Sequence, residues 1–160
     1  MSRFANWWVR RKRYEMEFVI KRSLPEPAVA VGLGRTFVIT PTEIRDENGL
    51  LLGRVERRAP PPANPLHPEA IDFALWQQGV VTAVFTRGVS SRPAFWFTYD
   101  NQTMRVHPLN HYVCDEIHAR TELPWFPPGQ CKYLIDDCVD PVSALFLFQM
   151  LENIDDETTE

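Results

Sequence analysis

The most informative segment of the sequence lies near the C-terminus and reads Asp140-Pro141-Val142-Ser143-Ala144-Leu145-Phe146-Leu147-Phe148-Gln149-Met150-Leu151. Asp140 is a favourable N-cap residue, and Pro141 suits the first helical position because a backbone N–H there would have no helical partner. We therefore predict a helix whose body runs from Val142 to about Ile154. Its apolar residues occupy every angular sector rather than one stripe, so this helix has to be surrounded on all sides.

The segments that precede this helix alternate in the manner of β-strands. The first, Tyr14 to Ile20, carries its apolar residues on one face and its charged residues on the other. The pair Asn48-Gly49 is typical of a hairpin turn, because both residue types accept positive φ angles. Three segments share a plan of strand, short polar turn and strand: Ile44 to Val55, Ala74 to Phe85, and Phe97 to Val106. With the further candidates Thr36 to Asp46, Asn110 to Ile117 and Gln130 to Ile135, about ten strands are predicted.

A β-rich (α+β) fold follows, in which a closed antiparallel β-barrel of about ten to twelve strands surrounds the C-terminal helix. Closure would also remove the exposed sheet edges that otherwise template aggregation. The competing arrangement clamps the helix between an open sheet and a partner subunit. One barrel domain is expected over residues 14–154, with a proline-rich loop at 59–69, a basic aromatic segment at 1–13 and an acidic tail at 155–160.

The order of these units resembles the tubby-like superfamily, in particular LURP-one-related proteins and phospholipid scramblases. The similarity is carried by the hairpins Ile44 to Val55 and Tyr99 to Val106, followed by the apolar ending Asp140 to Leu151. The resemblance covers roughly Tyr14 to Ile154 and implies a closed barrel of about twelve strands around a hydrophobic C-terminal helix. It also implies binding to lipid headgroups, without assigning that binding to particular residues.

Composition restricts the classes of partner. The chain has 160 residues, of which 17 are basic and 21 acidic, for a net charge of −4. This balance disfavours a protein whose whole surface follows nucleic-acid phosphates. The longest apolar run, Val142 to Leu151, is far shorter than the roughly 20 residues that a membrane-spanning helix needs. Three cysteines without close CxxC spacing indicate free thiols in a reducing compartment, so we expect a cytoplasmic protein able to associate peripherally with a membrane.

The candidate binding site is the cluster Trp7, Trp8, Arg10, Arg11, Lys12 and Arg13. Two amphipathic rings beside four cations are the composition of a segment that rests on an anionic membrane surface. The leading interpretation is therefore a non-enzymatic module that docks on anionic phospholipid headgroups. In the alternative interpretation the protein is an accessory subunit of a larger assembly, and this segment, the loop at 59–69 and the acidic tail contact protein neighbours.

A metal site is the weaker interpretation of a second cluster. His107, His111, Cys114 and His118, with Cys131 and Cys138 downstream, supply ligand types that zinc prefers. Their spacing matches no familiar ribbon or finger, so we expect buried thiols and surface imidazoles and no cofactor.

The sequence contains no recognised catalytic motif. Cys114, Asp115 and His118 are the one compact trio of nucleophile and base types, and Gly32-Leu33-Gly34 is a lone GxG without the spacing of a phosphate loop. The aromatic run Phe95, Trp96, Phe97 and Tyr99 has no interleaved cations, which favours a barrel wall over a surface that stacks on bases.

Overall fold

The computed structural model describes residues 15–22, 26–58, 71–88, 94–107, 112–113, 117–122 and 129–158. The predicted segment at 1–13 and the loop at 59–69 lie outside these ranges. The elements are β1 (Glu15–Lys21), β2 (Ala28–Gly32), β3 (Arg35–Ile39), β4 (Glu43–Asp46), β5 (Leu51–Arg58), β6 (Ile71–Gln77), β7 (Val80–Gly88), β8 (Ala94–Tyr99), β9 (Gln102–His107), β10 (Tyr112–Val113), β11 (Ala119–Glu122), β12 (Gln130–Asp136) and α2 (Pro141–Thr158).

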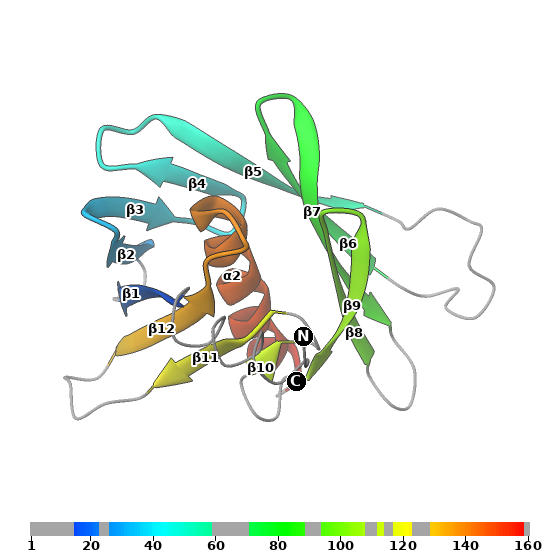
Figure 1. Cartoon of the computed structure of the whole chain (residues 1–160). Helices are drawn as coiled ribbons and strands as arrows, with labels where there is room; N and C mark the ends of the chain where they lie inside the picture. Colours follow the sequence, from blue (N-terminus) through cyan, green and yellow to red (C-terminus); the bar gives the residue numbers. More distant parts are fainter. Residues whose placement is uncertain are drawn as a thin grey trace, which may run out of the picture.

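The fold is β-rich, with one large antiparallel sheet wrapped around α2 (Figure 1). Twelve strands follow one another in the order β10-β9-β8-β7-β6-β5-β4-β3-β2-β1-β12-β11. The two strands at the ends of this order, β10 and β11, come within 8 Å of each other between Cα atoms. No hydrogen-bonded ladder joins them in the described ranges, so the ladder itself ends at these two strands.

Helix α2 fills the space inside the curved sheet. Each residue from Val142 to Met150 is buried, as expected for a helix that is apolar on every side. Phe146 packs on Phe97 of β8 with ring centroids 6.5 Å apart, whereas Phe148 packs on Tyr133 of β12 at 5.1 Å. Side chains two positions apart on a helix point in nearly opposite directions, so these two pairs join α2 to opposite walls. Burial of the helix is thus achieved within a single chain.

Two polar contacts fix the depth of α2 inside the sheet. The Tyr133 hydroxyl donates to the Ala144 carbonyl oxygen at 2.9 Å, and the Gln149 amide donates to the Thr40 carbonyl oxygen at 3.3 Å. Gly53 allows β5 to approach α2 closely on a third side of the helix, because a Cβ atom at this position would lie 2.9 Å from a Val142 methyl group. The helix therefore touches β3–β4, β5, β8 and β12 along its length.

The three hairpins predicted from strand–turn–strand patterns are confirmed as β4–β5, β6–β7 and β8–β9. One detail of the prediction is wrong, because only Gly49 of the pair Asn48-Gly49 has a positive φ, of 83°. The physical reason is Asp46, whose side-chain oxygen accepts hydrogen bonds from the Asn48 and Leu50 backbone N–H groups at 2.8 and 2.9 Å. The turn is therefore longer than a two-residue hairpin turn.

Strands β2 and β11 were not predicted, and the predicted single strand at 36–46 is two strands. β2 pairs with β1 and β3, and β11 pairs with β12. The chain reverses direction between β3 and β4, where Thr40 and Glu43 exchange hydrogen bonds. Helix α2 also continues to Thr158, beyond the predicted end near Ile154.

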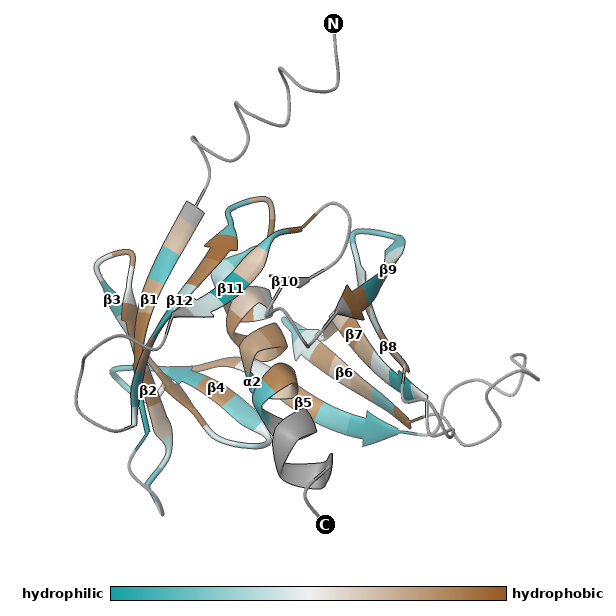
Figure 2. Ribbon diagram, turned by 90° about the horizontal axis from the view of Figure 1, so that it is seen from below, coloured by the Kyte–Doolittle hydropathy of each residue, from teal (hydrophilic) through white to brown (hydrophobic). Residues whose placement is uncertain are grey.

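The distribution of apolar residues agrees with a sheet that surrounds the helix. Apolar residues alternate with polar ones along the strands, and α2 is apolar over its buried turns (Figure 2). No helix in the described part of the chain has the length and apolar character needed to cross a membrane.

Candidate functional site

The residues of the predicted binding site, Trp7, Trp8, Arg10, Arg11, Lys12 and Arg13, lie outside the described ranges. The point at which they join the fold is nevertheless defined, because β1 begins at Glu15. Glu15 pairs with Asp136, the last residue of β12, and α2 begins just beyond at Pro141. The basic aromatic segment therefore enters the molecule at the end where α2 begins.

Antiparallel pairing places four turns at this same end. β2, β4, β6, β8 and β12 all run toward it, so the turns at 33–34, 47–50, 78–79 and 100–101 lie there together with the first turn of α2. We call this the hairpin end. The opposite end carries Arg22 and Glu152, whose side chains form an ion pair at 3.1 Å. Helix α2 thus runs from the hairpin end at Asp140 to the far end at Glu152.

A polar cluster of Asp140, Ser143, Tyr99 and Gln77 holds the start of α2. One Asp140 carboxylate oxygen accepts from the Ser143 backbone N–H at 3.1 Å, which is the N-cap contact predicted from the sequence. The other accepts from the Ser143 hydroxyl at 2.6 Å and from the Tyr99 hydroxyl at 3.1 Å. The Gln77 amide nitrogen lies 3.1, 3.2 and 2.8 Å from oxygens of Asp140, Ser143 and Thr82, and its two N–H groups are shared among these three acceptors.

This cluster positions the start of α2 and is not suited to proton transfer. Burial raises the pKa of the Tyr99 phenol, and the neighbouring Asp140 carboxylate adds to the rise. The phenol therefore stays protonated at neutral pH and donates its hydrogen bond. Tyr99 is the last residue of β8 and Gln77 the last of β6, so the cluster locks the helix start to two strands at the hairpin end.

Two cations at the hairpin end, Arg45 and Arg35, are held by their neighbours. The Arg45 guanidinium pairs with Glu43 at 2.7 Å and donates to the Gly49 carbonyl oxygen at 2.8 Å. The Arg35 guanidinium lies over the Phe37 ring, 4.8 Å from its centroid. These contacts hold two cations next to the turns at 33–34 and 47–50.

Exposed apolar side chains are concentrated at the hairpin end. In the described part of the chain, the large apolar residues with the highest exposure belong to β2–β3, β4–β5 and β6–β7. They are Val31, Leu33, Leu50, Leu51 and Val80. We refer to Leu33, Leu50 and Val80, which are in or next to the turns, as the apolar tips.

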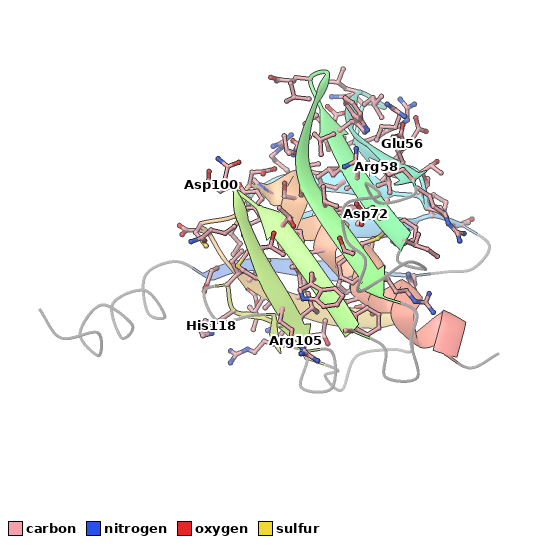
Figure 3. The ribbon with its side chains drawn as sticks, turned by 90° about the vertical axis from the view of Figure 1, so that its right-hand side faces the viewer. Glu56, Arg58, Asp72, Asp100, Arg105 and His118 are labelled. Atoms are coloured by element: carbon pink, nitrogen blue, oxygen red, sulfur yellow. The ribbon has the colours of Figure 1, made fainter. Side chains whose placement is uncertain are left out.

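The outer face of the sheet has a different character. A row of residues crosses four strand pairs in register: Arg58, Asp72, Thr86, Trp96 and Arg105. Figure 3 shows Arg58 and Asp72 together on this face, Arg105 farther along it, and Asp100 at the turn between β8 and β9. Asp72 is buried and accepts a hydrogen bond from the Thr86 hydroxyl at 2.8 Å. Both signs of charge occur along the row.

The residues considered for a metal site are dispersed or lie outside the described ranges. His111 and Cys114 fall outside them, as does the Asp115 of the trio Cys114, Asp115 and His118. Within the described part of the chain, no three His, Cys, Asp or Glu side chains gather closely enough to hold a metal ion. Cys131 is the second residue of β12 and Cys138 follows the end of that strand, so roughly 17 Å of extended strand separates them. Cys131 is half-buried, whereas Cys138 is exposed and not buried as expected, because it lies in the turn after β12. Burial raises the pKa of the Cys131 thiol to about 11, which keeps it protonated at neutral pH.

The aromatic run and the GxG motif both have structural roles. Phe95 and Phe97 are buried, and Phe95 stacks on Phe85 with ring centroids 6.0 Å apart. Trp96 points to the outer face. Gly32-Leu33-Gly34 forms the reversal between β2 and β3, with no helix after it, so it is not a phosphate loop.

Comparisons of the chain with models of protein families, with curated proteins and with solved structures found no match.

Proposed function

We propose that this protein is a non-enzymatic docking module that binds anionic phospholipid headgroups at the cytoplasmic surface of a membrane. The binding surface is the hairpin end together with Trp7, Trp8, Arg10, Arg11, Lys12 and Arg13. The observation that carries this proposal is the position of Glu15. The basic aromatic segment joins the fold at the end that holds the apolar tips, so both parts can meet one flat surface.

Charge polarity along α2 supports the same orientation. Residues 1–13, which join the fold at the hairpin end, hold five cations and no anion, whereas residues 152–160, which follow from the far end, hold five anions and no cation. From Asp140 to Glu152 the helix advances roughly 18 Å away from the hairpin end. The acidic C-terminal residues that follow Glu152 therefore continue from the far end. An anionic membrane would attract one end and repel the other.

The finer fold assignment belongs to the same proposal. We take the sheet to be a closed barrel of the tubby-like kind. Its support is the combination of twelve antiparallel strands, a buried helix at the C-terminus, and the approach of β10 to β11, the two strands at the ends of the sheet. β10 runs toward the hairpin end and β11 away from it, so the two edges have the antiparallel directions that closure requires.

Vesicle co-sedimentation of the full chain tests the proposal. Vesicles of phosphatidylcholine with phosphatidylserine should bind the protein, and vesicles of phosphatidylcholine alone should bind it much less. Changing Trp7, Trp8, Arg11 and Arg13 to alanine should abolish binding without unfolding the protein. The two arginines alone account for about 2 kcal/mol at low salt, because each cation near an anionic bilayer contributes about 1 kcal/mol.

A charge-matched control uses the far end. Lys21→Ala combined with Arg57→Ala also removes two exposed cations, but from the ends of β1 and β5 that lie away from the hairpin end. This variant should bind vesicles nearly as well as the unchanged protein. Unaltered binding by the N-terminal variant, or no binding by the unchanged protein, would refute the proposal. A stoichiometric protein partner captured in the absence of lipid binding would support the accessory-subunit interpretation instead.

A further inference from the structure

We infer that the apolar tips Leu33, Leu50 and Val80 insert into the bilayer surface, so that three consecutive hairpins and not only the basic segment hold the protein on the membrane. This inference rests on the proposed function and assigns a role to described residues. In Figure 1 the β2–β3 turn lies at the left of the molecule, the β4–β5 turn at the upper left and the β6–β7 turn at the top.

The exposure of the apolar tips is high and localised. Leu50 is 63% exposed, Val80 59% and Leu33 50%. In the sheet they occupy the β4–β5, β6–β7 and β2–β3 hairpins, all of which turn at the hairpin end. Single exposed apolar residues are common on proteins, but these are gathered at one end while that end also receives the segment with Trp7 and Trp8.

Leu33 occupies a backbone conformation that leucine disfavours. Its φ is 57°, and Gly34 follows with a φ of 68°, as in a two-residue turn with both central residues left-handed. Asparagine, aspartate or glycine relieves the steric conflict at such a position. A leucine there sacrifices local stability and still leaves half of its surface exposed. The side chain is therefore better explained by a partner outside the fold.

Leu50 is presented by a turn that is hydrogen-bonded throughout. The Leu50 backbone N–H donates to the Asp46 side chain at 2.9 Å, and the Leu50 carbonyl oxygen accepts from the Asp46 N–H at 3.0 Å. The Gly49 carbonyl oxygen accepts from the Arg45 guanidinium at 2.8 Å. A side chain carried on such a turn is held outward before it meets a partner, which lowers the entropy lost on binding.

The spacing of the apolar tips favours a bilayer over a protein surface. Neighbouring turns at this end are two strands apart, which corresponds to roughly 10 Å. Polar residues such as Glu47 and Gln78 lie between them and are exposed. Protein interfaces are built around a contiguous, closely packed centre. A bilayer accepts separate apolar groups at its headgroup and acyl boundary, and Arg35 beside Leu33 can remain among the anionic headgroups.

A pair of matched variants separates insertion from effects on the fold. Leu33→Asn and Gln78→Asn each place asparagine at the first left-handed position of a two-residue turn, because Gln78 has a φ of 51°. Only Leu33→Asn removes an apolar tip. Neither variant should lower the melting temperature. Leu33→Asn should weaken binding to vesicles of phosphatidylcholine with phosphatidylserine about tenfold, as expected for loss of one partly buried leucine, and Gln78→Asn should not.

The triple variant Leu33→Asn, Leu50→Asn and Val80→Thr gives the decisive comparison. The unchanged protein should retain part of its vesicle binding at high salt, because apolar insertion is not screened. The triple variant should retain much less binding at high salt than the unchanged protein, with the remainder supplied by Trp7 and Trp8, and should keep the salt-sensitive binding. Equal binding and equal salt dependence for both proteins would overturn the inference while leaving the proposed function in place. Absence of vesicle binding by the unchanged protein would overturn both.

A second copy of the chain could cover the apolar tips instead of a bilayer. The unchanged protein and the triple variant test this alternative in the absence of lipid. The unchanged protein should be monomeric by light scattering. A dimer that dissociates in the triple variant would show that a second copy of the chain covers the apolar tips, which contradicts insertion.

Discussion

Leucine has opposite environments in α2 and at the hairpin end. Leu145 and Leu147 are fully buried inside the curved sheet, whereas Leu33 and Leu50 are exposed on turns at its rim. Burying such a side chain stabilises by about 1.5–3 kcal/mol. In α2 this free energy contributes to folding. At the apolar tips it is still available, and so it can drive association. The difference teaches that one residue type maintains the fold in one region and serves as a binding element in another.

The largest effect should come from charging the interior. Phe146→Asp would place a carboxylate against Phe97 with no cation beside it in the described core, and an unpaired buried charge costs far more than the stability of a domain of this size. We expect the variant to be unfolded or insoluble, as judged by circular dichroism and yield. A soluble variant with a cooperative thermal transition would show that α2 is not enclosed by the sheet.

A second test truncates one leucine from each region. Leu147→Ala should lower the free energy of unfolding by about 2–5 kcal/mol, because it leaves a cavity in a packed core. Leu50→Ala should change it by less than about 0.5 kcal/mol, because the side chain is exposed. Urea unfolding of the two variants measures both quantities. Similar losses in the two variants would mean that Leu50 packs against the fold.

The smallest expected effect is the change of the unfolding free energy with pH, which tests the burial of two ionisable side chains in the interior. Burial raises the pKa of Tyr133 well above 10.0, and that of the Cys131 thiol from 9.0 to about 11. Both groups keep their protons in the folded state and release them more readily when unfolded. The stabilisation that these two groups contribute is therefore complete at low pH. The free energy of unfolding should decrease as the pH rises above about 9 because of Cys131, and further above 10 because of Tyr133.

Tyr133→Phe isolates the tyrosine contribution. Above pH 10 the unchanged protein should lose up to about 1.4 kcal/mol of unfolding free energy per pH unit through this residue. The phenylalanine variant should lack that part of the slope, although it starts from lower stability because the hydrogen bond to Ala144 is gone. Identical slopes in urea unfolding would show that the Tyr133 hydroxyl reaches solvent.

Much of the fold could be predicted because its main signals are local. Asp140 and Pro141 mark the start of α2, and the apolar residues on all sides of the helix require enclosure. Strands rich in β-branched and aromatic residues, such as β7 and β8, are equally recognisable. β2 was missed because Ala28 to Gly32 is a short run of small residues. β11 was missed because Ala-Arg-Thr-Glu has little apolar character and is a strand only through its pairing with β12.

The candidate site was predictable only in part. The segment from Trp7 to Arg13 stands out by composition alone. The apolar tips do not, because a sequence pattern alone predicts that leucines such as Leu33 and Leu50 are buried in the core. Their exposure follows from their position in turns at the hairpin end, which only the structure shows. One local signal was present at Leu33. A leucine followed by glycine between two β-branched segments occupies a turn position that normally holds asparagine or glycine.

Hydrogen–deuterium exchange of the full chain, with and without vesicles of phosphatidylcholine and phosphatidylserine, is the most direct test of membrane binding by the hairpin end. The account predicts that vesicles slow exchange in peptides that cover residues 1–14 and the turns at 33–34, 47–50 and 78–80, and leave the far end around Arg22 and Glu152 unchanged. Slowed exchange at the far end, or at no part of the hairpin end, would contradict it.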